Sequence, residues 1–313
     1  MATTTTTVAS GTGRGAAPVA AKGRRPKNRL DHQYPYWFYL PAAIIYSVLF
    51  LLPTFASFYF SLTRWTLFDV EFIGLDNFVA FFQEPALVKG LVNTLIYGVI
   101  TSGLKVVLGM LLAVLLTSQI IARGYLRSVV FFPVLLSGIG VGIMFQVLMN
   151  PERGLINDTL GVFGIEGPGW LTNPNLALYS VALIDVWKGV GLATLIYIAG
   201  IVSIPREYFE AAKVDGASST HSFFHIVLPL AKPATITVII LSLIGGLRSF
   251  DLIWATTRGG PGFSSDVIAS VIYKQYQAGF YGISTAGNVI LFILVTAIVV
   301  PLFMFLSRKE VDL

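Results

Sequence analysis

The sequence predicts an all-α polytopic membrane protein with six transmembrane helices and both termini in the cytoplasm. Three observations support this prediction: the apolar composition, the number of long apolar segments, and the uneven distribution of Lys and Arg. Of the 313 residues, 55% are hydrophobic and 12% are charged, and the mean hydropathy is +0.76. Soluble domains contain about 25% charged residues, so this composition is typical of a chain that folds in a lipid bilayer.

The apolar segments are long enough to cross the bilayer as helices. A spanning helix needs about 20 predominantly apolar residues. The predicted spans are residues 37–62, 91–118, 125–149, 176–204, 233–255 and 284–306.

The positive charges alternate between the two sides of these spans. If the N-terminus lies inside, the inner segments hold Arg14, Lys22, Arg24, Arg25, Lys27, Arg29, Arg123, Arg127, Arg206, Lys213, Lys232, Arg308 and Lys309. The outer segments then hold only Arg64, Lys89, Arg153, Arg258 and Lys274. By the positive-inside rule, both termini and the segment 205–232 are expected in the cytoplasm.

Residues 1–36 differ in composition from the rest of the chain. They are rich in Thr, Ala and Gly and carry a cluster of Lys and Arg without apolar periodicity. We therefore expect a disordered basic cytoplasmic tail, followed by a membrane domain over residues 37–313. The apolar run that begins near Trp37 is too long for the core of a secretory signal peptide, whereas an organellar transit peptide remains an alternative.

Several kinds of chemistry are absent from the sequence. The chain has no cysteine, which excludes disulfides and thiol catalysis. His221 and His225 have the spacing of metal ligands on a helix, but no third ligand accompanies them, so no metal site is predicted. We recognise no nucleotide-binding loop and no catalytic constellation, and the distribution of the positive charge does not indicate nucleic acid. The chain is not expected to be an enzyme.

The segment 205–232 predicts a helix–turn–helix finger that projects from the membrane. Pro205 suits the start of a helix, and Glu207 and Glu210 favour its N-terminal turns. The small side chains of Ala211 and Ala212 would let another backbone approach closely. Gly216 can adopt a positive φ and turn the chain. Ser218 or Ser219 can then cap a second short helix that ends by Pro229.

The same segment carries a family signature. Glu210-Ala211-Ala212, Gly216 and Ile226-x-Leu228-Pro229 form the pattern E-A-A-x₃-G-x₉-I-x-L-P. This pattern resembles the cytoplasmic loop of the membrane subunits of binding-protein-dependent ABC importers, and the resemblance covers residues 37–313. It implies the type I ABC importer permease fold, in which this finger is the coupling helix that docks in a cleft of an ATPase subunit. The implied ATPase-coupling residues are Glu210, Ala211, Ala212, Asp215, Gly216, Ile226, Leu228 and Pro229.

A second stretch narrows the resemblance. Phe250-Asp251-Leu252, Thr257-Arg258-Gly259-Gly260-Pro261 and Ile272-Tyr273 resemble the maltose-type carbohydrate permeases. This implies a permease subunit in the plasma membrane of a prokaryote that forms the path for a sugar or oligosaccharide. The implied partners are two ABC ATPase subunits, a second homologous permease in a heterodimer, and an extracytoplasmic solute-binding protein. No cofactor is expected on this chain, and ATP–Mg is used by the ATPase.

The charges within the predicted spans point to the translocation path. Such charges usually face the bundle interior or a wet cavity because they are costly in lipid. Aromatic side chains lie close to them in sequence, which is compatible with a polyol substrate. The candidate path residues are Asp185, Trp187, Lys188, Tyr197, Arg248, Phe250, Asp251 and Trp254. Asp185 with Lys188, and Arg248 with Asp251, have the spacing of ion pairs along one helix, and Lys105 in the second span has no assigned partner.

Three alternatives remain open from sequence. The cargo of an ABC importer permease can be a phosphorylated polyol that uses Arg248 or Lys188. An ion-coupled secondary transporter or channel would use Asp185, Arg248 and Asp251 as an ion relay, although the two halves of the chain show no inverted repeat. A membrane scaffold without transport would leave the finger and the charges within the spans unexplained.

Overall fold

The structure is a computed structural model that describes residues 36–66 and 68–308. The basic tail predicted over residues 1–36 lies outside the described residues apart from Tyr36. The chain divides into two units, Met1–Leu52 and Pro53–Leu313, each considered by itself below.

The first unit contains η2 (Tyr36–Tyr39), α1 (Leu40–Tyr46) and η3 (Ser47–Leu51), and α2 (Leu52–Phe60) begins at its last residue. Together these helices form an apolar stretch, Trp37–Phe60, that is long enough to cross a membrane. It corresponds to the predicted span 37–62.

The second unit is mainly helical, as predicted, and it also contains one short β-hairpin that the sequence did not indicate. Strand β1 (Thr63–Trp65) pairs antiparallel with β2 (Val70–Phe72), with Arg64 opposite Glu71. β-Branched and aromatic residues in both strands favour extended backbone. The facing charges add an exposed ion pair of 3.3 Å, of the kind that stabilises cross-strand positions.

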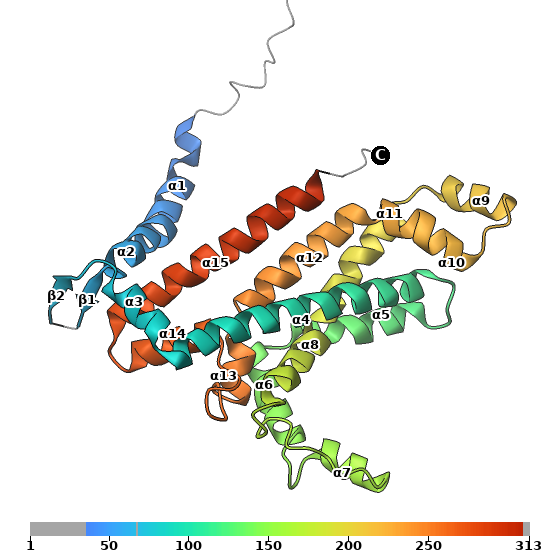
Figure 1. The fold of residues 1–313 in the computed structure, drawn as a ribbon. Coiled ribbons are helices and arrows are strands. Elements are labelled where there is room, and N and C mark those ends of the chain that lie inside the picture. The colour runs from blue at the N-terminus through green and yellow to red at the C-terminus, as the bar shows by residue number, and fades with distance from the viewer. Residues whose placement is uncertain (1–35, 67, 309–313) are drawn as a thin grey trace, which may run out of the picture. The chain divides into compact units, whose positions relative to one another are not determined.

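Four helices form the centre of the second unit: α4 (Pro85–Thr117), α8 (Ala177–Val202), α12 (Lys232–Leu247) and α15 (Tyr281–Ser307). Helix α12 contacts each of the other three, and α4 packs along α8 (Figure 1). Small residues allow these approaches. A Cβ on Gly109 would lie 2.8 Å from the Cβ of Ala193, and one on Gly200 would lie 2.6 Å from that of Ala234. Close backbone contact at small residues is typical of helices that associate in lipid.

Two predicted spans are broken rather than continuous. The span predicted over 125–149 consists of α5 (Arg123–Phe131) and η4 (Phe132–Leu135), followed at 99° by α6 (Gly138–Leu148). Pro133 lacks a backbone N–H and cannot sustain a regular helix through this region. The span predicted over 233–255 ends as a helix at Leu247 and resumes in α13 (Asp251–Thr256). Among the described residues, four helices are long and apolar enough to cross a membrane: Trp37–Phe60, α4, α8 and α15. The count rises to six if each of two bent pairs is one span, namely Arg123–Leu135 with Gly138–Leu148 and Ser219–Leu230 with Lys232–Leu247.

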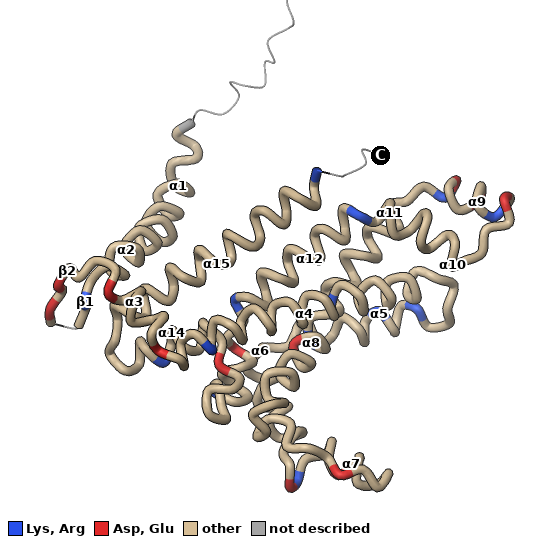
Figure 2. The backbone as a smooth tube through the Cα atoms, viewed as in Figure 1, with Lys and Arg blue, Asp and Glu red and all other residues tan. Residues whose placement is uncertain are grey.

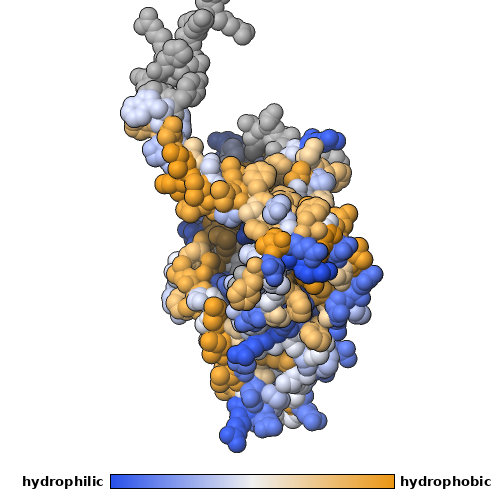
Figure 3. Space-filling view, turned by 90° about the vertical axis from the view of Figure 1, so that its left-hand side faces the viewer, coloured by the Kyte–Doolittle hydropathy of each residue, from blue (hydrophilic) through white to orange (hydrophobic). Residues whose placement is uncertain are grey.

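The remaining elements lie at the ends of these helices. They are α3 (Asp76–Gln83), α7 (Leu155–Val162), α9 (Arg206–Val214), α10 (Ser219–Ser222), η5 (Phe223–Val227), α11 (Leu228–Leu230) and α14 (Ile268–Gln277). In Figure 2 the charged residues lie mostly in these elements and at helix ends, and α15 has none along its length. On the face shown in Figure 3, hydrophobic side chains cover much of the helix surface, and the lower end, where the loop with α7 lies, is hydrophilic. Exposed apolar surface of this extent indicates contact with lipid or other membrane helices.

Candidate functional site

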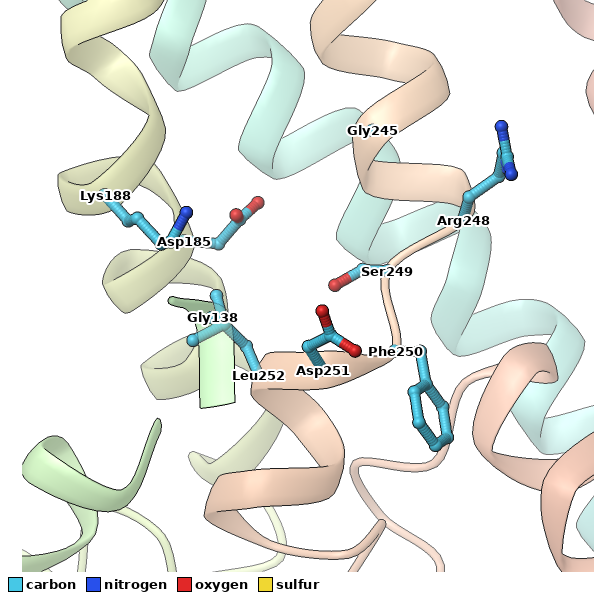
Figure 4. Close-up of a pocket in the computed structure, with 9 residues that line it drawn as sticks. All are labelled: Gly138, Asp185, Lys188, Gly245, Arg248, Ser249, Phe250, Asp251 and Leu252. Atoms are coloured by element: carbon cyan, nitrogen blue, oxygen red, sulfur yellow. The ribbon is translucent and has the colours of Figure 1, made fainter. Parts of the chain in front are cut away.

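The two helix breaks meet at one pocket. Gly138 begins α6 after the first break, and a Cβ there would lie 3.2 Å from the Cβ of Asp251, which begins α13 after the second. The cavity has a volume of about 260 Å³. Its lining residues are Gly138, Asp185, Lys188, Gly245, Arg248, Ser249, Phe250, Asp251 and Leu252 (Figure 4). Irregular backbone at membrane depth is tolerated where it lines such a cavity.

Side chains from α8, from α13 and from the connection between α12 and α13 line this pocket. In Figure 4, α8 presents Asp185 and Lys188 on one side, and the hydroxyl of Ser249 projects toward them from the other. The side chains of Arg248 and Phe250 point away from Asp185. The four charged residues predicted for the substrate path therefore line one cavity, although they come from two different predicted spans, 176–204 and 233–255.

Asp185 pairs with a residue on another helix. Its Oδ2 accepts a hydrogen bond from Nζ of Lys105 on α4 at 2.7 Å, and the side chains of Lys105 and Asp185 are 9% and 17% exposed. A Cβ on Gly189 would lie 2.7 Å from Cε of Lys105, so the absence of a side chain there makes room for the lysine. Among the described residues, neither the Asp185–Lys188 pair nor the Arg248–Asp251 pair forms, and Lys188 and Arg248 have no carboxylate partner.

A second cavity adjoins the first. It has a volume of about 210 Å³ and is lined by Lys105, Lys188, Gly189 and Gly245 among others. Lys188 and Gly245 line both cavities. The ion pair therefore lies between them, with Asp185 in the wall of the first and Lys105 in the wall of the second.

Aromatic side chains flank the first pocket. The ring of Phe250 stacks on that of Trp254 with centroids 5.6 Å apart, and Tyr273 meets both rings edge-on at 5.4 and 4.8 Å. Phe250 and Tyr273 also line a further cavity of about 320 Å³, together with Tyr276 and Asn288. The sequence analysis used Tyr273 only within the stretch that resembles maltose-type permeases, and it gave Tyr276 and Asn288 no role. The aromatic residues Tyr273 and Tyr276, three apart on α14, were the available signal.

Two predicted path residues lie outside this group. Trp187 on α8 is 40% exposed and contacts Phe145 edge-on at 5.3 Å. Tyr197 is fully buried in an apolar cluster with Met110 and Val238. Neither of them lines the pocket of Figure 4.

The finger has the predicted helix–turn–helix form. Gly216 has φ of +74° between α9 and α10, and Oγ of Ser218 accepts from the backbone N–H of His221 at 3.2 Å. On α9, Glu210 and Ala211 are exposed, as is Asp215 just after it, whereas Ala212 is half-buried. This divides α9 into a free face and a face that packs on the molecule.

The second half of the finger continues further than predicted. Ile226 lies in η5, and α11 continues through Leu228 and Pro229 to Leu230. Pro229 is accommodated because it lies in the first turn of α11, where a backbone N–H is not needed. The chain then bends by 68° into α12. The rings of His221 and His225 stack with centroids 4.0 Å apart.

A buried network of hydrogen bonds holds the loop 257–268, and the sequence analysis did not predict it. The fully buried carboxylate of Asp266 accepts from Nζ of Lys274 at 2.6 Å and from Oγ of Ser270 at 2.8 Å. Nδ2 of Asn93 on α4 donates to the carbonyls of Ser264 and Asp266 at 2.9 and 2.8 Å. The loop includes the Gly259-Gly260-Pro261 turn that the resemblance singled out. Gly259 has φ of +83°, and a Cβ there would overlap the Asp266 carboxylate.

Comparison with known proteins shows what the chain is similar to. Residues 105–309 match the family described as "Binding-protein-dependent transport system inner membrane component". The probable ABC transporter permease protein YurN of Bacillus subtilis (strain 168) is 32% identical over 88% of this chain and 97% of its own length. The trehalose/maltose transport system permease protein MalF of Thermococcus litoralis is 33% identical over 83% of this chain and 89% of its own.

The fold is similar to that of a solved transporter. A chain in the crystal structure of a bacterial ABC transporter involved in the import of the acidic polysaccharide alginate matches with a TM-score of 0.76 and 25% identity. The match covers 88% of this chain and 96% of that one. The fold is therefore the type I ABC importer permease fold, and this chain belongs to the family of inner membrane components of binding-protein-dependent transport systems, as a multi-pass permease subunit.

Proposed function

We propose that this permease subunit forms part of the path for a sugar or oligosaccharide in an ABC importer. The observation that carries the proposal is the meeting of two helix breaks and α8 at one polar pocket beside a stacked aromatic pair. Pockets for small molecules combine apolar or aromatic walls with a few placed polar groups. Here Ser249, Asp251 and Lys188 supply hydrogen-bonding groups for hydroxyls, and Phe250 supplies an aromatic face for C–H groups.

A second permease completes this path. The cavity of about 260 Å³ on this chain is smaller than the 300–1,000 Å³ of typical small-molecule sites. An oligosaccharide needs more space, so the opposite wall comes from a related permease in a heterodimer. An extracytoplasmic binding protein delivers the sugar to the outer end.

The chain crosses the membrane six times, with both termini in the cytoplasm. This takes α5 to α6 as one span and α12 as another, and it follows the excess of Lys and Arg in the inner segments. The finger then lies in the cytoplasm, where ATP is available. Two ATPase subunits bind ATP–Mg, and each grips the finger of one permease.

The exposed face of α9 is the surface that the ATPase subunit binds. Glu210, Ala211 and Asp215 are exposed on it, and the small Ala211 side chain allows close approach of another backbone. Ala212 packs on the other face, and Gly216 sets the turn. Ile226, Leu228 and Pro229 transmit movement of the finger to α12, which ends at the pocket. ATP and the sugar bind different states of the transporter. Their binding therefore shifts the transporter between its two states, which produces alternating access.

Reconstitution with its partners tests this function. The tagged chain is purified gently from its host, the accompanying proteins are identified, and the complex is placed in liposomes with the binding protein. We expect two ATPase copies and one related permease per chain, with ATP hydrolysis stimulated by the sugar-loaded binding protein. A chain that purifies alone and carries solute down an ion gradient without ATP would contradict the proposal.

A phosphorylated polyol is the second candidate cargo. The favouring observation is that Lys188 and Arg248 line the pocket without carboxylate partners among the described residues. A phosphate would pair with such cations. The stimulation assay separates the two cargoes, since neutral sugars and polyol phosphates can be supplied separately to the same complex.

A further inference from the structure

A cavity at the finger end of the molecule has a cationic wall. It has a volume of about 690 Å³ and lies between the finger, α5 and the ends of α4 and α8. The described residues that line it include Arg123, Arg127, Arg206 and Lys213 but no carboxylate. Within the described residues, none of the four forms an ion pair.

Arg127 provides an independent sign of a missing partner. Its Nη2 donates to the carbonyl of Leu116 at 2.9 Å, but its buried Nε has no hydrogen-bond partner in the described part of the chain. Buried donors are nearly always paired, so this nitrogen is available to donate to an oxygen of a bound anion. The positive-inside rule accounts for cations at this end of the chain, but it does not account for a buried guanidinium nitrogen without an acceptor.

Apolar side chains also line the cavity. Val114 comes from the last turns of α4, and Ile201 and Val202 come from the end of α8, where Val202 is 68% exposed. Apolar residues at the ends of membrane helices beside a cationic loop match the profile of a phospholipid, with acyl chains on one side and a phosphate on the other. Arginine suits this role because its planar guanidinium pairs with phosphate through two parallel hydrogen bonds.

We propose that this cavity binds a phosphate-bearing anion, with the headgroup of an anionic lipid as the expected source. The placement at the inner membrane surface rests on the proposed topology. Anionic lipids at that surface attract basic segments next to transmembrane helices. Since Arg206 and Lys213 belong to α9, the bound anion holds the packed face of the coupling finger to the membrane ends of α4 and α5.

Binding to the purified full-length chain tests this proposal. Phosphatidylglycerol and phosphatidylcholine are titrated in mixed micelles, and bound lipid is measured by native mass spectrometry and by the shift in Tm. The wild type is expected to bind phosphatidylglycerol more tightly than phosphatidylcholine. Loss of charge-assisted contacts is expected to weaken phosphatidylglycerol binding by at least about tenfold in Arg127→Gln and in the double variant Arg206→Gln/Lys213→Gln.

The double variant keeps the test valid if Arg127→Gln fails to fold, because Arg206 and Lys213 are exposed. Arg153→Gln is the matched control, since Arg153 is an exposed arginine outside the cavity. It should bind like the wild type. A parallel titration with inorganic phosphate identifies the source of the bound anion. If phosphate raises the Tm of the wild type and the same cavity variants abolish that rise, the anion is a soluble phosphate. If phosphate leaves the Tm unchanged, the anion is the lipid headgroup.

Equal affinity for the two lipids without a response to phosphate, or an equal loss in Arg153→Gln, would overturn the proposal. So would wild-type affinity in both cavity variants. Because no ATPase or sugar enters these titrations, their failure is distinguishable from failure of the proposed transport function.

Discussion

Nζ of Lys105 donates to Oδ2 of Asp185 at 2.7 Å, and this contact joins α4 to α8 between two adjoining cavities. It also removes Asp185 from the set of free charges in the pocket. An ion relay through Asp185 would have to break this ion pair. The pair therefore argues against the secondary-transporter alternative and favours the permease function. The remaining free charges are those of Lys188, Arg248 and Asp251.

Loss of one partner of this pair should destabilise the fold. Lys105→Met leaves a largely buried carboxylate unpaired, and breaking buried pairs costs about 3–5 kcal/mol. The loss of stability should lie at the lower end of this range, because Asp185 borders a cavity. The double variant Lys105→Met/Asp185→Leu should recover most of the loss, since an apolar pair replaces the charges. Unfolding in detergent measures each free energy, with exposed Lys89→Met on the same helix as the control. The single variants are Lys105→Met and Asp185→Leu. If the double variant loses as much free energy of unfolding as the two single variants together, the ion pair contributes nothing to stability.

Gly216 is required for its backbone conformation rather than for space. Its φ is +74°, and no atom of the described residues lies within 4 Å of a Cβ built there. Asn tolerates this region of backbone space, whereas a β-branched residue is strained in it. Gly216→Asn should therefore retain sugar-stimulated ATP hydrolysis in the reconstituted complex, and Gly216→Val should lose most of it.

The control for this prediction is Gly161→Val. Gly161 also has no neighbour within 4 Å of a Cβ, but its φ is not positive. Both valine variants should insert into the membrane. Wild-type stimulation of ATP hydrolysis in Gly216→Val would show that the turn at Gly216 is not needed for coupling to the ATPase.

Asn93 should control the order of the loop 257–268. Asn93→Leu leaves two carbonyls, of Ser264 and Asp266, without their donor, at a cost of about 1–3 kcal/mol for a buried unsatisfied group. Hydrogen exchange should become faster in this loop and remain unchanged in α8. The exposed Asn175 provides the control variant Asn175→Ala. Unchanged exchange in the loop of Asn93→Leu would mean that the Asp266 contacts alone hold it.

Phe250 should affect the recognition of sugar more than stability. Phe250→Ala removes the ring that stacks on Trp254 and lines two cavities. Aromatic contacts contribute about 0.5–1.5 kcal/mol, so half-maximal transport should need about two- to twelvefold more sugar. Phe250→Tyr should behave like the wild type, and so should Phe163→Ala, a change at an exposed loop phenylalanine. Normal sugar dependence in Phe250→Ala would exclude the aromatic ring from the path.

Local rules made part of this structure predictable. Run length and hydropathy locate α4, α8 and α15 to within several residues because a helix in lipid must satisfy its own backbone. The positive φ of Gly216 and the cap at Ser218 follow from the conformational freedom of glycine and the short hydroxyl side chain of serine. The short hairpin of β1 and β2 was missed because its six paired residues adjoin an apolar run that reads as helix.

The sequence by itself determined that this protein crosses the membrane, carries a helix–turn–helix finger and places charges within its spans. Composition, apolar run length and residue-specific backbone preferences are local properties that one chain reveals directly. Only the tertiary structure decided that Asp185 pairs with Lys105 rather than Lys188, that Tyr197 lies in an apolar cluster, and that Asn93 reaches Asp266. These partners are 80 or more residues apart or depend on which helix faces which. Such choices are made by the packing of helices at small residues, which no local pattern specifies.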